Sequence, residues 1–130
     1  LLLIPESACN VQALPENYQL ILDSHTNMGS YASPGSVSCI VFNLAIFPEE
    51  IIHLQPEVKP AFGIDPGFNL LKKGGMISLC IYSGGDSGFE ERDQILDWLK
   101  NLDPHQYLVI KSEYYNRPNN PPIPVLIIKN

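Results

Sequence analysis

Residues 37–44 read VSCIVFNL and residues 76–82 read MISLCIY, and these two stretches decide the fold class of the chain. Both are apolar along nearly their whole length, a pattern typical of parallel strands that are covered on both faces of a sheet. A shorter β-prone run, YQLIL at 18–22, precedes them and predicts a further strand. Together these stretches predict an α/β fold.

The segment between the two main strands contains three prolines (Pro56, Pro60 and Pro66), which exclude a long uninterrupted helix. We expect short helical turns at 51–54 and 67–73. Lys72 and Lys73 suit the carboxyl end of the second turn, where cations oppose the helix dipole. Gly74 can then adopt the left-handed conformation that closes it.

The second half of the chain predicts a helix followed by a β-hairpin. Ser87 and Glu90 match a capping box. Apolar residues at helical spacing follow on one side, with Trp98 packing at their edge: Phe89, Ile95, Leu96, Leu99 and Leu102. Strands are expected at 107–115 and 123–129, and the RPNNPP link between them is short enough for an antiparallel pair. The predicted order is β(α)βαββ.

Length and composition fit one domain spanning residues 1–130. A hydrophobic content of 45% excludes a disordered tail. No apolar run approaches the ~18 residues that a membrane span needs, so no membrane partner is expected. The chain opens on Leu1, and we interpret its LLLI start as a strand remnant of a longer chain rather than the end of a signal segment.

The cysteines and histidines show no metal-binding pattern. Cys9, Cys39 and Cys80 are far apart, and Cys39 and Cys80 fall inside apolar strands, where cysteine behaves as a small buried hydrophobe. No spacing suits zinc, so no metal site is predicted. The expected setting is reducing and cytoplasmic, or organellar in a eukaryote.

The charge balance disfavours non-specific binding to nucleic acid. Eight basic residues face fourteen acidic ones, which gives a net charge of −6. Phosphate binding without sequence or shape recognition should therefore be weak. An RNA ligand would have to be recognised locally, or with the help of positive surface outside this chain.

Polar residues gather where the predicted parallel strands end, at the edge of an α/β sheet where ligands bind. The clusters are Asp23-Ser24-His25, Asn43-Leu44 and 82–86, which begins with Tyr82. Asp23 and Ser24 could hydrogen-bond a ribose or an adenine edge, or Asp23 could simply cap the following segment. His25 could orient a ligand or be structural. Asn43 could serve a ligand or a local turn.

Two loops invite a functional interpretation. GGDSG at 84–88 lacks the lysine of a phosphate-binding loop and the full spacing of a dinucleotide motif, so a flexible turn is favoured. In RPNNPP, prolines stiffen the link while Asn119 and Asn120 present amide groups, although a purely structural turn has equal weight. No serine or cysteine triad, and no nucleophile elbow, can be defended from spacing.

These motifs, in this order, resemble a family. DSH at 23–25, VFNL at 41–44, LLKKGGMISLCIY at 70–82, EERDQILDWLKNLD at 90–103 and the N-x-x-N-N-P-P run at 116–122 are similar to the bacterial and plant family first called ribosomal-RNA methylases. That family is now associated with methylation of 5-aminomethyl-2-thiouridine at the tRNA wobble position. The resemblance runs from about residue 18 to residue 129.

The resemblance implies the carboxyl-terminal part of a class I, Rossmann-like methyltransferase, which transfers a methyl group from S-adenosylmethionine to a tRNA or other RNA amine. It implies that Asp23, Ser24 and His25 lie near the adenosine and Asn43 near the reacting centre. Tyr82 would be a second catalytic residue. The substrate nucleotide would be bordered by the loop residues Asn119, Asn120, Pro121 and Pro122.

The sequence also departs from the family. The glycine-rich cofactor segment, D-A-T-x-G-N-G-x-D-T, is not in it, nor is the first βαβ half that carries it. AIFPEEII at 45–52 replaces a G-Y-L-P-G-G-D-K run, and YSGGD at 82–86 replaces Y-H-G-H-P. The alternative function is therefore a catalytically inactive, methyltransferase-like interaction module. In either case we expect the open edge of strand 37–44 to pair with a second copy of the chain or with 18–22.

Overall fold

The computed structural model describes residues 18–44, 64–83 and 88–130. The element order is η3 (His25–Ser30), β1 (Val37–Leu44), α2 (Asp65–Leu70), β2 (Leu71–Ile81), α3 (Gly88–Lys100), β3 (Tyr107–Lys111) and β4 (Ile123–Lys129). The expected helical turn at 51–54, the glycine turn and the Ser87 cap lie outside these residues. No helix in the described part is long and apolar enough to cross a membrane.

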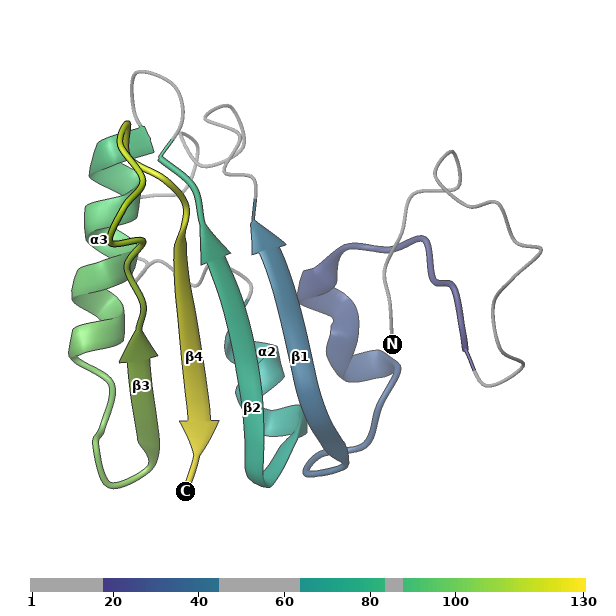
Figure 1. Cartoon of the computed structure of the whole chain (residues 1–130). Coiled ribbons are helices and arrows are strands. Elements are labelled where there is room, and N and C mark those ends of the chain that lie inside the picture. The colour runs from purple at the N-terminus through teal and green to yellow at the C-terminus, as the bar shows by residue number, and fades with distance from the viewer. Residues whose placement is uncertain (1–17, 45–63, 84–87) are drawn as a thin grey trace.

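The four strands form one sheet in the order β1-β2-β4-β3 (Figure 1). β1 and β2 are parallel, whereas β4 runs antiparallel to both β2 and β3. This confirms the predicted fold class, a mixed α/β sheet in which a parallel pair is followed by an antiparallel hairpin.

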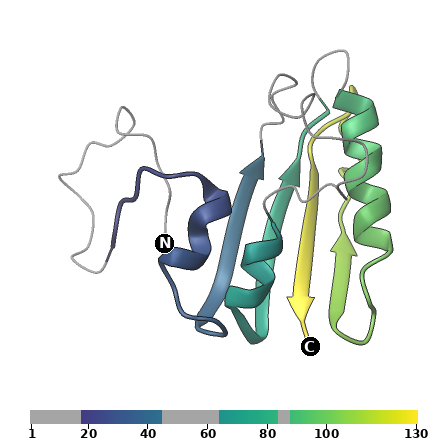
Figure 2. The same ribbon diagram turned by 180° about the vertical axis from the view of Figure 1, so that it is seen from behind.

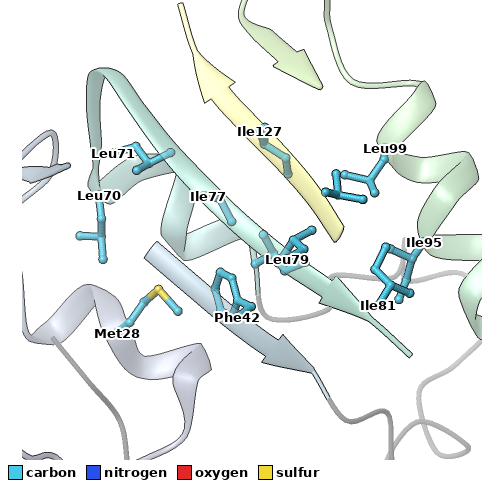
Figure 3. Close-up of a cluster of buried hydrophobic side chains, with 12 residues drawn as sticks. Met28, Phe42, Leu70, Leu71, Ile77, Leu79, Ile81, Ile95, Leu99 and Ile127 are labelled. Carbon is cyan, nitrogen blue, oxygen red and sulfur yellow. The ribbon is translucent and has the colours of Figure 1, made fainter. Parts of the chain in front are cut away.

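The core lies on one face of this sheet. Figures 1 and 2 show η3, α2 and α3 on the same side of the strands. The buried side chains of that face come from β1, β2, β4 and all three helices, and Figure 3 shows most of them: Met28, Phe42, Leu70, Ile77, Leu79, Ile81, Ile95, Leu99, Val125 and Ile127. Full burial of each large aliphatic side chain contributes about 1.5–3 kcal/mol. The apolar spacing of α3 is thus confirmed at its centre, although Phe89 is 44% exposed.

The opposite face of the sheet is open in the described part of the chain. Val41 is 70% exposed and Leu108 50%. The continuous apolar pattern predicted cover on both faces, and for the described residues this is wrong. The pattern arises because β1 and β2 carry apolar side chains on both faces of the sheet. Only the side chains on the face of Phe42 and Leu79 contact the helices.

The predicted strand at 18–22 is wrong. Only Leu20 makes an isolated bridge, and η3 begins at His25. Among the apolar residues of this run only Ile21 is buried, while Leu22 is 76% exposed. The run therefore lacks the continuous buried face of a strand in a sheet. It does not pair with β1 as a strand, and among described residues β1 pairs with β2 alone.

The helix before β2 ends earlier than predicted, and Lys72 and Lys73 belong to the strand. α2 stops at Leu70 because Leu71 turns to an extended backbone and its side chain is fully buried. The ladder passes from Val37↔Leu71 to Cys39↔Met76, so 72–75 form an irregularity. Gly74 does adopt a positive φ of 76°, but within this irregularity and not as a helix cap.

The hairpin is confirmed, with a shorter first strand than the predicted 107–115. β3 ends at Lys111, and the amide of Ser112 donates to the Pro124 carbonyl at 2.8 Å. The ladder cannot continue beyond this point because Pro122 and Pro124 lack the N–H donors that it needs.

Candidate functional site

The carboxyl ends of β1 and β2 form a shared rim, because the two strands are parallel (Figure 1). Asn43 is paired with Cys80 and Leu44 with Ile81, and Tyr82 follows directly. The side chains of paired residues share a face, and those two apart on a strand do as well. Asn43, Cys80 and Tyr82 therefore lie on the open face, at the rim.

β4 begins at the same rim. The pair Ile81↔Ile123 places the next residues, Tyr82 and Pro122, side by side. The NNPP loop thus adjoins the end of β2. Asn119 and Asn120 are exposed and both adopt left-handed backbone, with φ of 66° and 50°. Asparagine tolerates this region better than most residues.

Asp23, Ser24 and His25 reach the rim from the helix side. The His25 ring meets the Phe42 ring edge-on, with centroids 5.9 Å apart. Phe42 points into the core, whereas Asn43 points to the open face. The structure therefore brings Asn43 and Tyr82 together, and places Asp23–His25 beside the end of β1 but on the other side of the sheet.

The carboxylate of Asp23 is held by local hydrogen bonds. Its Oδ1 accepts from the Ser24 amide at 2.7 Å and from Asn27 Nδ2 at 2.8 Å, and its Oδ2 accepts from the Tyr31 hydroxyl. The Tyr31 bond, then those from Asn27 and Ser24, lower the pKa of Asp23, against a small opposing effect of burial. Asp23 is therefore ionised at neutral pH.

Ser24 also has a local role. It is the N-cap of η3, and its Oγ accepts from the Thr26 amide at 3.4 Å and lies 2.9 Å from Thr26 Oγ1. The capping interpretation weighed for this cluster therefore accounts for Ser24 and for part of the hydrogen bonding of Asp23.

Asn43 differs from these residues. Its side chain is exposed and forms no hydrogen bond to another described residue. The alternative of a local turn bond is not seen in the described part of the chain. A free amide with one acceptor and two donors is thus available at the rim.

Tyr82 is a hydrogen-bond donor at neutral pH. Its side-chain hydrogen bond with Cys80 is the largest of the effects that raise the pKa of Tyr82, followed by electrostatic interaction with Cys80, by burial and by the neighbouring Tyr114. Next to it, Ser83 Oγ is buried and has no hydrogen-bond partner among the described residues. A buried hydroxyl without a partner is costly.

Sequence reasoning missed two of these residues. Cys80 was interpreted only as a buried hydrophobe, and Tyr114 was assigned to a strand, whereas Ser83 belonged to the polar cluster 82–86. The signal for Tyr114 was the EYYN run just ahead of RPNNPP, where a strand would have buried at least one ring. The described residues hold no group of three or more histidine, cysteine or acidic side chains that could bind a metal.

The comparisons with known proteins agree with this fold. Residues 5–128 match the family model described as "Putative rRNA methylase". A crystal structure described as a putative rRNA-methylase from Clostridium thermocellum is 36% identical, with a TM-score of 0.67, and the match covers 85% of this chain and 56% of that one.

Two further crystal structures are similar. A putative methyltransferase from Streptococcus mutans, in complex with S-adenosylhomocysteine (SAH), is 28% identical with a TM-score of 0.65, over 86% of this chain and 61% of that one. An rRNA methylase from Streptococcus thermophilus is 24% identical, with a TM-score of 0.64 over 88% and 58%, and supports the fold alone. This chain thus spans between 56% and 61% of the length of these solved structures.

Proposed function

The chain belongs to the family described as "Putative rRNA methylase", and from this membership we propose that it forms part of an S-adenosylmethionine-dependent RNA methyltransferase and contacts both the cofactor and the substrate. The structure from Streptococcus mutans contains SAH, the product left by that cofactor. The single observation that carries the proposal is the strand register, since Asn43↔Cys80 and Ile81↔Ile123 gather Asn43, Tyr82 and the NNPP loop at one rim.

The described residues fit a nucleoside cofactor. The Asp23 carboxylate offers about four lone-pair sites, and three hydrogen bonds occupy it, so one site remains for a ribose hydroxyl. Asn43 has an amide without a bond to a described residue, and Ser83 has a buried hydroxyl that lacks a partner there. We propose that Asp23, Ser24, His25 and Asn43 hold the cofactor.

When bound, S-adenosylmethionine would supply a methyl group on a sulfonium sulfur. The proposed acceptor is the exocyclic amine of 5-aminomethyl-2-thiouridine at the wobble position of tRNA. A nitrogen–carbon bond forms as the carbon–sulfur bond breaks, and the amine loses a proton to water. This transfer requires the neutral amine to be held in line, so correct positioning supplies much of the rate.

Two residues suit that positioning. The amide oxygen of Asn43 accepts a hydrogen bond from the amine and directs its lone pair. The ordinary pKa of tyrosine lies well above 7 and that of Tyr82 is raised further, so Tyr82 stays protonated. Its hydroxyl, once turned away from Cys80, donates a hydrogen bond to the nucleobase rather than removing a proton. The neighbouring Asn119, Asn120, Pro121 and Pro122 border the flipped-out nucleotide.

Calorimetric titration with SAH tests this proposal. We expect binding by the chain, and at least about 10-fold weaker binding by Asn43→Ala, the loss of one hydrogen bond to a charged ligand. Ser38→Ala, an exposed change near the opposite end of β1, should bind as the unchanged chain does. Equal affinities for all three proteins would contradict the role of Asn43.

A second candidate is the catalytically inactive interaction module. The observation that favours it is the local use of Ser24 as the N-cap and of Asp23 as the acceptor for Tyr31 and Asn27. A folded chain that shows no heat of binding with SAH would support this module over the enzyme.

A further inference from the structure

Two adjacent tyrosines are exposed to solvent in the loop between β3 and β4. We call this loop, residues 112–122, the tyrosine loop. Tyr114 is 51% exposed and Tyr115 is 104% exposed. A tyrosine ring is a large apolar surface that proteins usually cover at least in part. Here the second ring contacts nothing that would shield it, so it is available to a partner.

The tyrosine loop is held at both ends. At its start, the Ser112 amide donates to the Pro124 carbonyl at 2.8 Å, and Lys111 forms an ion pair of 2.7 Å with Glu113. Near its end, the fixed φ of Pro121 and Pro122 limits the backbone. A loop ordered before binding loses less conformational entropy when a ligand docks.

The tyrosine loop borders the proposed methyl-transfer site. Pro122 lies beside Tyr82 through the register of β2 and β4. Tyr114 is close enough to Tyr82 to influence its titration. Any substrate that reaches Asn43 and Tyr82 from the open face therefore passes next to the loop.

The charge of the loop suits a polyanion locally. Lys111 and Glu113 neutralise each other, while Arg117 is exposed and makes no ion pair with a described residue. In a chain of net charge −6, one unpaired guanidinium beside two exposed rings is a localised site. Guanidinium for phosphate, together with aromatic rings for bases, is the combination that binds single-stranded nucleic acid.

We propose that the tyrosine loop binds unpaired RNA next to the target nucleotide, with a base stacked on Tyr115 and a phosphate contacted by Arg117. The inference rests on the proposed function, because it takes RNA as the substrate. Single-stranded RNA is favoured over duplex because a stacked base must be unpaired. It is favoured over a protein partner because Asn119 and Asn120 add amide groups that can read base edges from the same loop.

The test is fluorescence anisotropy with a short, unstructured, mixed-sequence RNA, in the absence of any cofactor. Tyr115→Ala should weaken binding about 5- to 150-fold, the range for loss of one stacked base. Tyr115→Phe should restore it, since stacking needs the ring and not the hydroxyl. Tyr18→Ala removes another exposed tyrosine, outside the site, and should leave the affinity unchanged.

Salt dependence tests the phosphate contact. Arg117→Ala should reduce the slope of log affinity against log salt by about 0.7, the value for one phosphate contact on a single strand. A duplex of the same length should bind more weakly than the single strand. The inference would be overturned if the unchanged chain did not bind RNA, or if the chain and Tyr115→Ala bound RNA with equal affinity. Equal affinities would favour a protein as the partner of the tyrosine loop.

The two proposals fail separately. The RNA assay contains no SAH, and the calorimetric assay contains no RNA. RNA binding that depends on Tyr115, without any binding of SAH, would contradict the proposed methyltransferase function and support RNA binding by the tyrosine loop. SAH binding without RNA binding would support the methyltransferase function and contradict RNA binding by the loop.

Discussion

The imidazole of His25 meets the Phe42 ring at an interplanar angle of 77°, which is an edge-to-face contact. Phe42 is 6% exposed and belongs to the core, and the next residue, Asn43, faces the opposite side of the sheet. The contact therefore joins the Asp23–His25 segment to the strand end that carries Asn43, whose amide is proposed to position the substrate amine. It is the link between the two sides of the candidate site.

Replacing His25 should loosen this link. His25→Ala removes an edge-to-face pair, which is worth about 0.5–1.5 kcal/mol beyond area burial. We expect a small loss in thermal stability and weaker binding of SAH, measured by melting and by calorimetry. His105→Ala, in the exposed turn before β3, is the matched control. Identical SAH affinity in both variants would remove His25 from the cofactor site.

Asp23 should contribute stability that depends on pH. Hydrogen bonds from Tyr31, Asn27 and Ser24 hold the pKa of Asp23 below its ordinary value of 3.8 in the folded state. Its contribution is therefore fully present above that ordinary value and is lost as the pH falls through the lower folded value. Asp23→Asn should unfold more easily in denaturant at pH 7.

The difference between Asp23→Asn and the unchanged chain should narrow in acid, below about pH 4. The two denaturation midpoints, followed from pH 7 downward, check this. A difference that stays constant across the whole range would show that the carboxylate is not responsible.

Lys129 should stabilise the junction between α2 and β2. Its ammonium donates to the Phe68 carbonyl at 2.8 Å and to the Leu71 carbonyl at 3.0 Å, and so satisfies groups at the end of α2. Lys129→Met keeps the aliphatic stem but removes the charged donor from these two carbonyls. We expect a loss of about 1.5–3 kcal/mol in the free energy of unfolding. Lys72→Met, at an exposed position, should cost much less, and equal losses would argue against this role.

The free edge of β1 should pair with a second copy of the chain. β1 is the first strand of the sheet and, among described residues, pairs on one side only. An apolar strand with an unpaired edge invites pairing with another chain. Light scattering should therefore show a dimer that forms as concentration rises.

A lysine on the exposed strand should oppose that pairing. Val41→Lys is expected to shift the chain towards monomer, since Val41 is 70% exposed and a charge on an edge strand disfavours association. Leu108→Lys, at a 50% exposed position of β3 at the other edge of the sheet, is the control. A chain that stays monomeric at all concentrations would contradict the dimer.

The sequence predicted the parallel pair and the hairpin well because their signals are local and strong. The strand bounds of β1 and β4 are confirmed, since each is a continuous apolar run bounded by turn residues. The predicted element bounds were wrong where a contact between residues far apart in the sequence determines the local structure. Whether Lys72 continues a helix depends on the burial of Leu71 and on Lys129, which lies 58 residues away from it.

The sequence predicted that the candidate site lies at the rim of the sheet. It did not predict that Asn43 and Tyr82 lie on one face of the sheet and Asp23 on the other. Parallel strands place Asn43 and Tyr82 at one edge whatever their exact register. The helix-side position of Asp23 follows from the contact between His25 and Phe42, and spacing gives no sign of that contact. In the same way, the exposed ring of Tyr115 depends on where β3 ends, which Pro124 in β4 and Pro122 just before it determine.

Amide shifts in an isotope-labelled sample of the chain, recorded by NMR as SAH is added, test the central claim most directly. We predict saturable shifts concentrated at the rim, in His25, Asn43, Tyr82 and Ser83, with little change in Tyr107 and Lys129 at the opposite edge of the sheet. Shifts confined to that opposite edge, or no shifts at a saturating excess of the ligand, would contradict the account.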